Sequence, residues 1–168
     1  MLIYQKLTKE NYEEVLKIKH MLFPESNSDE DYVQYFNNEI KANYYLVLKD
    51  GESCATIGWY EVDSENAFVG WFGVLPQFQG IGLGKETLNF IIDEVESLGY
   101  DYLRVYTDKV VNPISIKLYD KAFDIREDYT FPDKIGKTNN FVIYTKSFNG
   151  VCEKWKNRPL NEDDNYNM

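Results

Sequence analysis

The chain has 168 residues, of which 43% are hydrophobic and 16% aromatic, and its formal net charge is −10 at pH 7. It can bury a single-domain core, but it lacks the roughly 20-residue apolar run of a membrane span and the clustered basic residues that hold nucleic-acid phosphates. Two cysteines, one histidine and an N-terminus without a basic and apolar leader lead us to expect a cytoplasmic protein with neither a disulfide framework nor a metal site.

The first half of the chain predicts four strands and two helices before a glycine-rich turn. The Asp50-Gly51 pair predicts a tight hairpin turn, and Thr8 is expected to cap the first helix. The expected elements are a strand at 2–7, an amphipathic helix at 8–22, a second helix at 32–41, hairpin strands at 44–49 and 55–62, and an aromatic-rich strand at 67–74.

The second half predicts two more helices and three more strands. A helix at 85–98 carries one apolar face and is expected to end at Gly99, a typical C-terminal cap. A strand at 102–106, a helix at 112–123 and strands near 125–131 and 140–147 complete the series. We expect residues 1–150 to form one domain and residues 151–168 to form a polar, partly frayed C-terminal extension.

A glycine-rich turn joins the strand at 67–74 to the helix at 85–98. It follows Pro76 and reads Gln79-Gly80-Ile81-Gly82-Leu83-Gly84-Lys85. The order strand, glycine turn and helix brings unpaired backbone N–H groups and the positive end of a helix dipole to one point. Glycines there let a ligand approach the backbone. The pattern therefore predicts an anion site suited to a phosphate or pyrophosphate.

Three other interpretations of the glycines are a P-loop, a dinucleotide-binding fingerprint and a simple turn. A P-loop would have a glycine in place of Gln79 and a serine or threonine in place of Glu86, and a dinucleotide fingerprint would have a glycine in place of Lys85. The structural alternative is a tight turn at a helix entry that binds nothing. The glycines alone do not decide between this turn and an anion site.

A second motif favours the anion site. Residues 112–123 read Asn-Pro-Ile-Ser-Ile-Lys-Leu-Tyr-Asp-Lys-Ala-Phe. Together the two segments resemble the GCN5-related N-acetyltransferase (GNAT) superfamily, in which Gln/Arg-x-x-Gly-x-Gly/Ala binds the pyrophosphate of acetyl-CoA. Gln79, Gly82 and Gly84 match that pattern. The family's downstream helix is matched by Asn112, Ser115, Leu118, Tyr119, Lys121 and Phe123, with Ala122 at the usual glycine.

The resemblance implies a GNAT-like α/β (α+β) fold. Its mixed, mostly antiparallel sheet would have six to seven strands flanked by about four helices, in the order β-α-α-β-β-β-α-β-α-β-β. It also implies an acyltransferase with acetyl-CoA as cosubstrate, in which the N–H near Phe72 polarises the thioester oxygen. By analogy with other oxyanion donors, this would stabilise the transition state by about 3 kcal/mol. The implied cofactor-binding residues are Phe72, Gly73, Val74, Gln79, Gly80, Ile81, Gly82, Leu83, Gly84, Lys85 and Asn112.

The catalytic candidates are Tyr119 and Glu61. The family's tyrosine equivalent to Tyr119 lies beside the CoA sulfur, and a phenol with a pKa near ~10 can protonate a thiolate. The alternative is a core role, because Ile116, Tyr119 and Phe123 have the spacing of a buried helix stripe. Asn112 has a similar alternative as a helix cap before Pro113.

The general base is the weakest part of the resemblance. Some relatives place a glutamate on the strand before the glycine turn, and residues 67–74 contain no carboxylate. Glu61, near the end of the preceding strand, is the nearest candidate, with Glu25 behind it; a solvated surface charge is the alternative for both. Water could remove the amine proton instead. His20 and Cys54 are expected to serve packing.

The segment at 25–39 suggests the acceptor. Its acidic residues beside aromatic walls suit a small cation, and a solvated helix face is the alternative. The residues are Glu25, Asp29, Glu30, Asp31 and Glu39 with Tyr32, Tyr35 and Phe36. We expect acetyl transfer to a primary amine of a small cationic metabolite. A protein or peptide N-acetyltransferase and a non-catalytic CoA-binding sensor are the alternatives. No nucleic-acid or membrane partner is expected, and a homodimer is left open.

Overall fold

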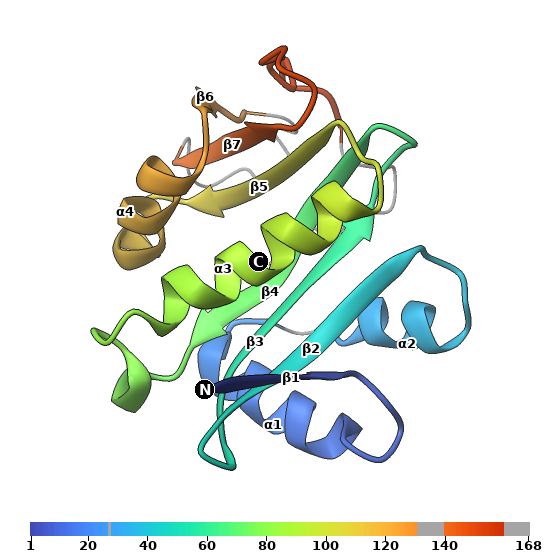
Figure 1. Ribbon diagram of the computed structural model, residues 1–168, viewed down its shortest axis with the longest axis vertical. Helices are drawn as coiled ribbons and strands as arrows, with labels where there is room; N and C mark the ends of the chain where they lie inside the picture. The colour runs from blue at the N-terminus through green and yellow to red at the C-terminus, as the bar shows by residue number, and fades with distance from the viewer. Residues whose placement is uncertain (27, 131–139, 160–168) are drawn as a thin grey trace. The chain divides into compact units, whose positions relative to one another are not determined.

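The computed structural model describes residues 1–26, 28–130 and 140–159. The elements are β1 (Leu2–Lys6), α1 (Tyr12–Leu22), α2 (Glu30–Phe36), β2 (Ala42–Lys49), β3 (Glu52–Glu61), β4 (Asn66–Val74), the 3-10 turn η1 (Pro76–Phe78), α3 (Leu83–Ser97), β5 (Tyr102–Asp108), α4 (Pro113–Ala122), β6 (Ile125–Asp128) and β7 (Phe141–Ser147) (Figure 1). The strands form one sheet in the order β1-β2-β3-β4-β5-β7-β6, with β4 and β5 parallel. The predicted element order and mixed sheet are confirmed. Residue 131, the end of one predicted strand, lies outside the described residues.

Backbone contacts divide the chain into two compact units. Unit 1 comprises Met1–Glu61 and Val69–Asp93. Unit 2 comprises Val62–Phe68 and Glu94–Tyr166, of which the residues up to 159 are described. The glycine turn therefore belongs to unit 1, and the second motif belongs to unit 2.

Unit 1 is built on an antiparallel hairpin. Strands β2 and β3 pair on either side of Asp50 (φ 50°) and Gly51 (φ 84°), and two successive positive φ values are those of a type I′ turn. The predicted Asp50-Gly51 hairpin is confirmed. Strand β2 ends at Lys49 as predicted, and β3 begins at Glu52, closer to the turn than predicted, because this turn type matches the twist of the strands directly beside it.

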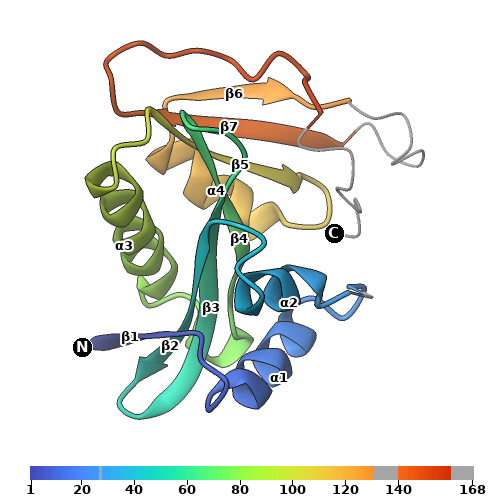
Figure 2. The same cartoon turned by 90° about the vertical axis from the view of Figure 1, so that its right-hand side faces the viewer.

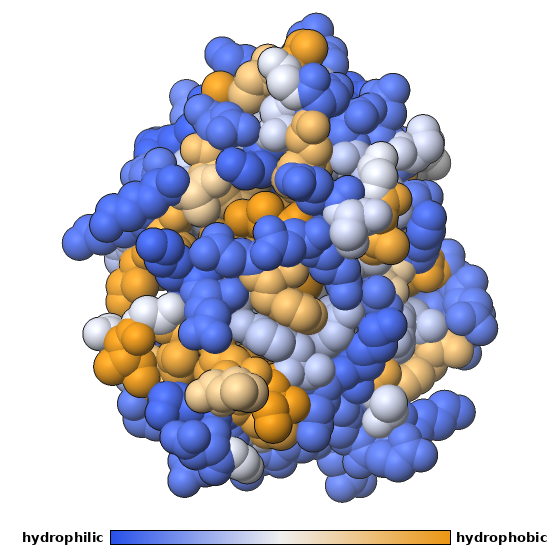
Figure 3. All heavy atoms as spheres, viewed as in Figure 1, coloured by the Kyte–Doolittle hydropathy of each residue, from blue (hydrophilic) through white to orange (hydrophobic). Residues whose placement is uncertain are grey.

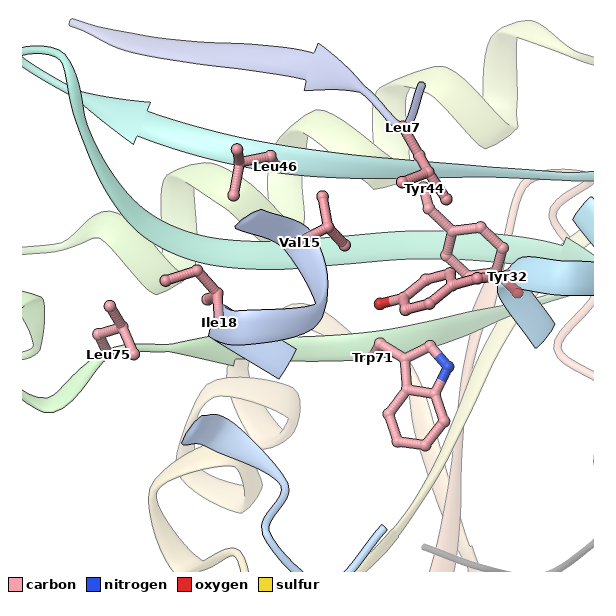
Figure 4. Packing of buried hydrophobic residues seen from close by; sticks show 8 residues of the cluster. All are labelled: Leu7, Val15, Ile18, Tyr32, Tyr44, Leu46, Trp71 and Leu75. Carbon is pink, nitrogen blue, oxygen red and sulfur yellow. The ribbon is translucent and has the colours of Figure 1, made fainter. Parts of the chain in front are cut away.

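Helices cover both faces of the strands in unit 1. Helices α1 and α2 lie on one side and the first part of α3 on the other (Figure 2). Neighbouring residues of β2 point to opposite faces: the Tyr44 ring meets Tyr32 of α2 and the Tyr45 ring meets Phe90 of α3, each with 5.0 Å between ring centroids. The buried cluster on the α1 side comprises Leu7, Val15, Ile18, Tyr32, Tyr44, Leu46, Trp71 and Leu75 (Figure 4).

Two helices of unit 1 are shorter than predicted. Helix α1 begins at Tyr12 because Thr8 bonds Asn11 instead of capping the helix: the Thr8 N–H donates to Asn11 Oδ1 at 2.8 Å, and the Asn11 N–H to Thr8 Oγ1 at 3.3 Å. Helix α2 ends at Phe36, since Asn38 adopts a left-handed φ of 56° that a right-handed helix cannot contain.

A buried arginine organises unit 2. The guanidinium of Arg104, on β5, donates to Asn66 Oδ1 at 2.7 Å, to Thr145 Oγ1 at 2.8 Å and to the carbonyl of Glu153 at 2.8 Å. Arg104 is 1% exposed, so these bonds replace its lost hydration. They join the start of β4, strand β7 and the segment after β7 to the middle of the sheet.

The beginning of the C-terminal extension is packed on unit 2. Trp155 is 1% exposed, and its indole N–H donates to the carbonyl of Arg158 at 2.7 Å. The two oxygens of Glu127, on β6, accept the backbone N–H groups of Trp155 and Lys156 at 2.7 and 2.8 Å. Residues 160–168, where most of the predicted fraying would fall, lie outside the described residues.

Hydrophilic side chains cover most of the face drawn in Figure 3. In the described part of the chain, no helix is both long and apolar enough to cross a membrane.

Candidate active site

The glycine turn has the geometry of a main-chain anion site. Gly80 and Gly82 adopt φ values of +81° and +87°, and a Cβ built on either would meet no other atom within 4 Å. The first hydrogen bond of α3 runs from the Glu86 N–H to the Gly82 carbonyl at 3.1 Å. The N–H groups of Leu83 and Gly84 therefore precede the helical ladder and have no acceptor within the helix. The turn leads directly into the positive end of a 15-residue helix.

Gln79 fastens this turn to the strand before it. Its side-chain Nε2 donates to the carbonyl of Val74, the last residue of β4, at 2.9 Å. The η1 turn between them is closed by the Gln79 N–H, which donates to the Pro76 carbonyl at 3.2 Å. The position of the glycines relative to the end of β4 is thereby fixed. Ile81 and Lys85, two further predicted binding residues, are exposed beside it.

Strand β4 is irregular next to the predicted Phe72–Val74 segment. Trp71 has a φ of 46°, which is costly for a bulky residue and interrupts the regular pleat. Its carbonyl accepts a hydrogen bond from Thr56 Oγ1, on β3, at 2.7 Å. Gly73 makes room for packing: a Cβ there would approach the side chain of Leu22, on α1, to 3.0 Å.

Lys19 is a buried residue of this region that the sequence analysis missed. It is 0% exposed, and its ammonium lies 3.9 Å from the centre of the Trp71 ring and 5.4 Å from that of Tyr32. The ammonium also donates to the carbonyl of Ser28 and to Asp29 Oδ1. Its position four residues after Val15, on the apolar face of α1, is the sequence signal that could have found it.

Two acidic residues of the segment at 25–39 are occupied within the protein. Asp29 bonds Lys19 at 2.7 Å, and His20 Nε2 lies 3.0 and 3.2 Å from its two oxygens. Burial alone would raise the pKa of Asp29, but the bonds and charges of Lys19 and His20 outweigh it and lower that pKa. Asp31 Oδ2 accepts the Trp71 indole N–H at 3.0 Å. Burial raises the pKa of Asp31, and the Trp71 bond only partly offsets this.

Glu61 lies apart from the irregular part of β4. Its carboxylate pairs with Lys41 at 3.6 Å, and its side chain is 30% exposed. Thr56, which bonds Trp71, stands five residues earlier on β3, so at about 3.3 Å per residue Glu61 is roughly 17 Å further along the strand. This separation weighs against Glu61 as a base at Phe72–Val74. Cys54 is buried, and burial raises the pKa of its thiol, as suits a packing residue.

In unit 2, Asn112 stands immediately before α4. It occupies the N-cap position and Pro113 the first turn, but its side chain makes no capping bond. The amide instead donates through Nδ2 to Thr107 Oγ1, at the end of β5, at 3.1 Å. The bond orients the amide, so its carbonyl oxygen is a candidate acceptor for a ligand.

Tyr119 is buried on α4. It is 3% exposed, and its ring lies 5.6 Å from Phe123 and 5.5 Å from Tyr144, centroid to centroid. Burial, and to a smaller extent Tyr144, raises the pKa of the Tyr119 phenol above its ordinary value of 10. The hydroxyl therefore stays protonated across the neutral range. The two roles expected for Tyr119 are therefore compatible: its ring packs in the buried stripe of α4, and its hydroxyl carries a proton that it can donate.

The sequence belongs to a known enzyme family. The family described as Acetyltransferase (GNAT) matches residues 11–124, more than half of the chain, and the chain belongs to this family. Its members are acyltransferases that use acetyl-CoA. The resemblance drawn from the two motifs is confirmed. Among curated proteins no match is found.

Solved structures share the fold. A GNAT family acetyltransferase from Elizabethkingia anophelis with acetyl-CoA bound is 19% identical over 87% of this chain and 97% of its own (TM-score 0.64). The ribosomal-protein-S18-alanine N-acetyltransferase from Escherichia coli is 18% identical over 92% and 98% (TM-score 0.68). A chimera of the spermidine N-acetyltransferase SpeG from Vibrio cholerae with hSSAT is 16% identical over 88% and 95% (TM-score 0.70). These likenesses establish the fold.

Replacing Gly82 with alanine tests the glycine turn, with Gly51→Ala as the matched control. Both residues have positive φ and open space around a Cβ, so each substitution should cost about 1–2 kcal/mol of folding free energy, measured by urea unfolding. Only Gly82→Ala strains the backbone of the turn that leads into α3. We expect it to weaken acetyl-CoA binding at least about tenfold by calorimetry (about 1.4 kcal/mol). Equal affinity for the two variants would contradict the assignment.

The opposite pKa shifts of Asp29 and Asp31 mean that ionisation of Asp29 stabilises the fold, whereas ionisation of Asp31 opposes folding. Asp29 has a lowered pKa, so its contribution is present above the unfolded value of about 3.9 and is lost as the pH falls through the lower native value. Asp29→Asn also removes the partner of buried Lys19 and should cost about 1–3 kcal/mol at pH 7. Because ionising Asp31 opposes folding, Asp31→Asn should change stability by less than about 1 kcal/mol. Urea unfolding between pH 3 and pH 7 measures both; equal losses would refute the prediction.

Proposed function

We propose that this acetyltransferase moves the acetyl group of acetyl-CoA to a primary amine of a small cationic metabolite by direct attack, with Tyr119 as general acid. The observation that carries the cosubstrate half is the glycine turn, where open space and unused amides meet at the start of α3. Membership of the GNAT family agrees with it. The acceptor and the catalytic roles are the proposed part.

The loop residues would hold the pyrophosphate without a cluster of positive side chains. First-turn N–H groups at Leu83, Gly84 and Lys85 supply directional donors, and the helix dipole adds favourable potential. The Lys85 ammonium is free to turn toward the same region because it is exposed. Asn112 would contribute its side-chain oxygen to the cosubstrate, with Nδ2 already bonded to Thr107.

The Phe72–Val74 segment of β4 would hold the acyl arm. Parallel pairing of β4 with β5 covers Asn66, Ala67 and Phe68, and Phe72 lies beyond it. An N–H donor aimed at the thioester oxygen stabilises the negative charge that develops when the amine attacks. The amine loses a proton in this step. With Glu61 paired to Lys41 and distant along β3, we assign the proton's removal to water.

Tyr119 would return a proton to the departing thiolate. Its raised pKa makes it a weaker acid than a tyrosine in water, so transfer to a hydrated thiolate would be unfavourable. A thiolate released beside a buried phenol is itself desolvated, and desolvation raises its basicity in the same way. Because the pKa values of the phenol and of the CoA thiol are both raised, the difference between them grows less than the shift of Tyr119 alone would suggest. Proton transfer or a strong hydrogen bond between the two groups then becomes feasible.

The preference for a cationic acceptor rests on charge. The net charge of −10 attracts cations at long range, and Glu25, Glu30 and Glu39 of the acidic segment are exposed. Asp29 and Asp31 are not among the carboxylates that would attract the acceptor, because both are bonded within the protein. A spermidine N-acetyltransferase chimera is among the proteins that share the fold, as is a protein N-acetyltransferase.

The test is release of the CoA thiol from acetyl-CoA in the presence of pooled amines. One pool holds polyamines, aminoglycosides and amino acids, and the other holds short peptides with free N-termini. We expect release with the first pool, at a rate that falls with ionic strength because the attraction is electrostatic. Release with peptides alone would identify a protein acetyltransferase. Acetyl-CoA binding without release from either pool would identify a CoA-binding sensor.

Replacing Tyr119 with phenylalanine removes the hydroxyl and keeps the ring packed against Phe123 and Tyr144. As general acids contribute about 10²–10⁴-fold, kcat should fall by that order with little change in KM for acetyl-CoA. Tyr144→Phe is the matched control, since its hydroxyl bonds Asp120 at 2.6 Å. Unchanged turnover of Tyr119→Phe at saturating substrates would remove Tyr119 from the mechanism.

A further inference from the structure

Trp71 is held from three directions. Its indole N–H donates to Asp31 on α2, its ring lies under the ammonium of Lys19 on α1, and its carbonyl accepts from Thr56 on β3. We call these four residues the Trp71 clamp. All belong to unit 1. Figure 4 shows Trp71 extending from β4 beside Tyr32 in the same buried cluster.

The Trp71 clamp contributes less to the folding free energy than purely apolar packing of the same residues would. Lys19 is fully buried although a charged group loses hydration there, and Trp71 adopts a left-handed φ of 46° that disfavours bulky side chains. Strained backbone of this kind persists only where the surroundings determine it, and it gathers at functional sites. A leucine at position 19 would fill the same core without an ammonium. The polar contacts therefore specify one orientation of Trp71.

The consequence falls on the next amide. The carbonyl of Trp71 and the N–H of Phe72 belong to one planar peptide unit and point in opposite directions. The Thr56 hydroxyl fixes that carbonyl at 2.7 Å, so it also fixes the direction of the Phe72 N–H. Asp31 and Lys19 hold the side chain of Trp71 and thereby help to fix the peptide unit that joins Trp71 to Phe72.

We propose that Thr56, Asp31 and Lys19 are positioning residues for acetyl transfer, which aim the Phe72 N–H at the thioester oxygen through Trp71. This rests on the proposed function, in which that N–H is the oxyanion donor. Helices α1 and α2 thereby control the rate of the chemical step through the backbone of β4. None of the three positioning residues needs to touch a substrate.

Thr56 gives the sharpest test, because two substitutions separate its hydroxyl from its shape. Thr56→Val keeps the shape and removes the donor, while Thr56→Ser keeps the donor. We expect Thr56→Val to lower kcat about 10- to 100-fold and to change KM for acetyl-CoA less than about threefold. The loss in kcat should be smaller than the roughly 10²- to 10³-fold loss caused by deleting an oxyanion donor, because the Phe72 N–H is still present. Thr56→Ser should restore most of the rate. A merely structural role would lower the active fraction and the unfolding midpoint without this pattern.

A second measurement does not need the acceptor. In ¹⁵N-labelled protein, acetyl-CoA should shift the Phe72 amide resonance downfield, and CoA, which lacks the acyl oxygen, should not. Thr56→Val should lose the difference and Thr56→Ser should keep it. An equal shift in Thr56→Val and the wild type overturns the proposal. If calorimetry finds no acetyl-CoA binding to the wild type, the proposed function fails first and this inference fails with it.

The helix side of the clamp is tested with Asp31 and Lys19. Asp31→Leu and Lys19→Met should each lower kcat about 3- to 30-fold, and Asp31→Asn, whose oxygen can still accept the indole N–H, should lose less. Combined with Thr56→Val, each should cost less than the sum of the single effects, because all act on one peptide plane. Lys17→Met, an exposed position on α1, is the matched control. Additive losses, or normal rates in both helix variants, would confine the positioning role to Thr56.

Discussion

Electrostatics sets the main constraint on this enzyme, because a chain with a net charge of −10 has to hold acetyl-CoA, which carries several phosphate charges. Lysines and arginines in sufficient number would cancel the attraction of the protein for the cationic acceptor that we propose. Main-chain N–H groups avoid this conflict, since they bind an anion without changing the net charge. In the site that we propose, Gly80 and Gly82 serve this end, because their positive φ values turn the chain into α3. The same protein can then present a negative field to its second substrate.

The carboxylates of the segment at 25–39 fall into two groups, those bonded within the protein and those exposed to solvent. Asp29 and Asp31 appear from sequence to be two more charges of an acidic surface, but one compensates Lys19 and the other accepts the Trp71 N–H. Aromatic walls and carboxylates do surround a cation here, and that cation is the protein's own Lys19. Asp29, Tyr32 and Trp71 therefore surround a cation of the protein itself, and only the exposed Glu25, Glu30 and Glu39 are left for the proposed attraction of a substrate.

The sequence predicted features whose causes are local and missed those that depend on distant residues. The Asp50-Gly51 turn and the end of α3 before Gly99 follow from the backbone freedom of one or two residues, and both are found. The glycine turn is another local signal. The place of Lys19 on the apolar face of α1 is a local sign of its burial, but its partner Trp71 is distant in the sequence. The burial of Arg104 depends on Glu153, and no local pattern contains either pair.

The burial of Tyr119 bears on which group governs the pH dependence of the reaction. A phenol whose pKa lies above 10 is protonated throughout the range in which the enzyme would be assayed, so its own titration contributes no change there. The acceptor amine must be neutral to attack, and a primary amine in water is mostly protonated at pH 7. A negatively charged protein attracts the protonated form, which is the unreactive one, so binding and reactivity make opposite demands on the amine. In the proposed reaction, water that reaches the bound amine carries the proton away after binding, so this proposal needs no separate carboxylate base. The absence of a carboxylate from the Ala67–Val74 sequence is in keeping with such a division of roles.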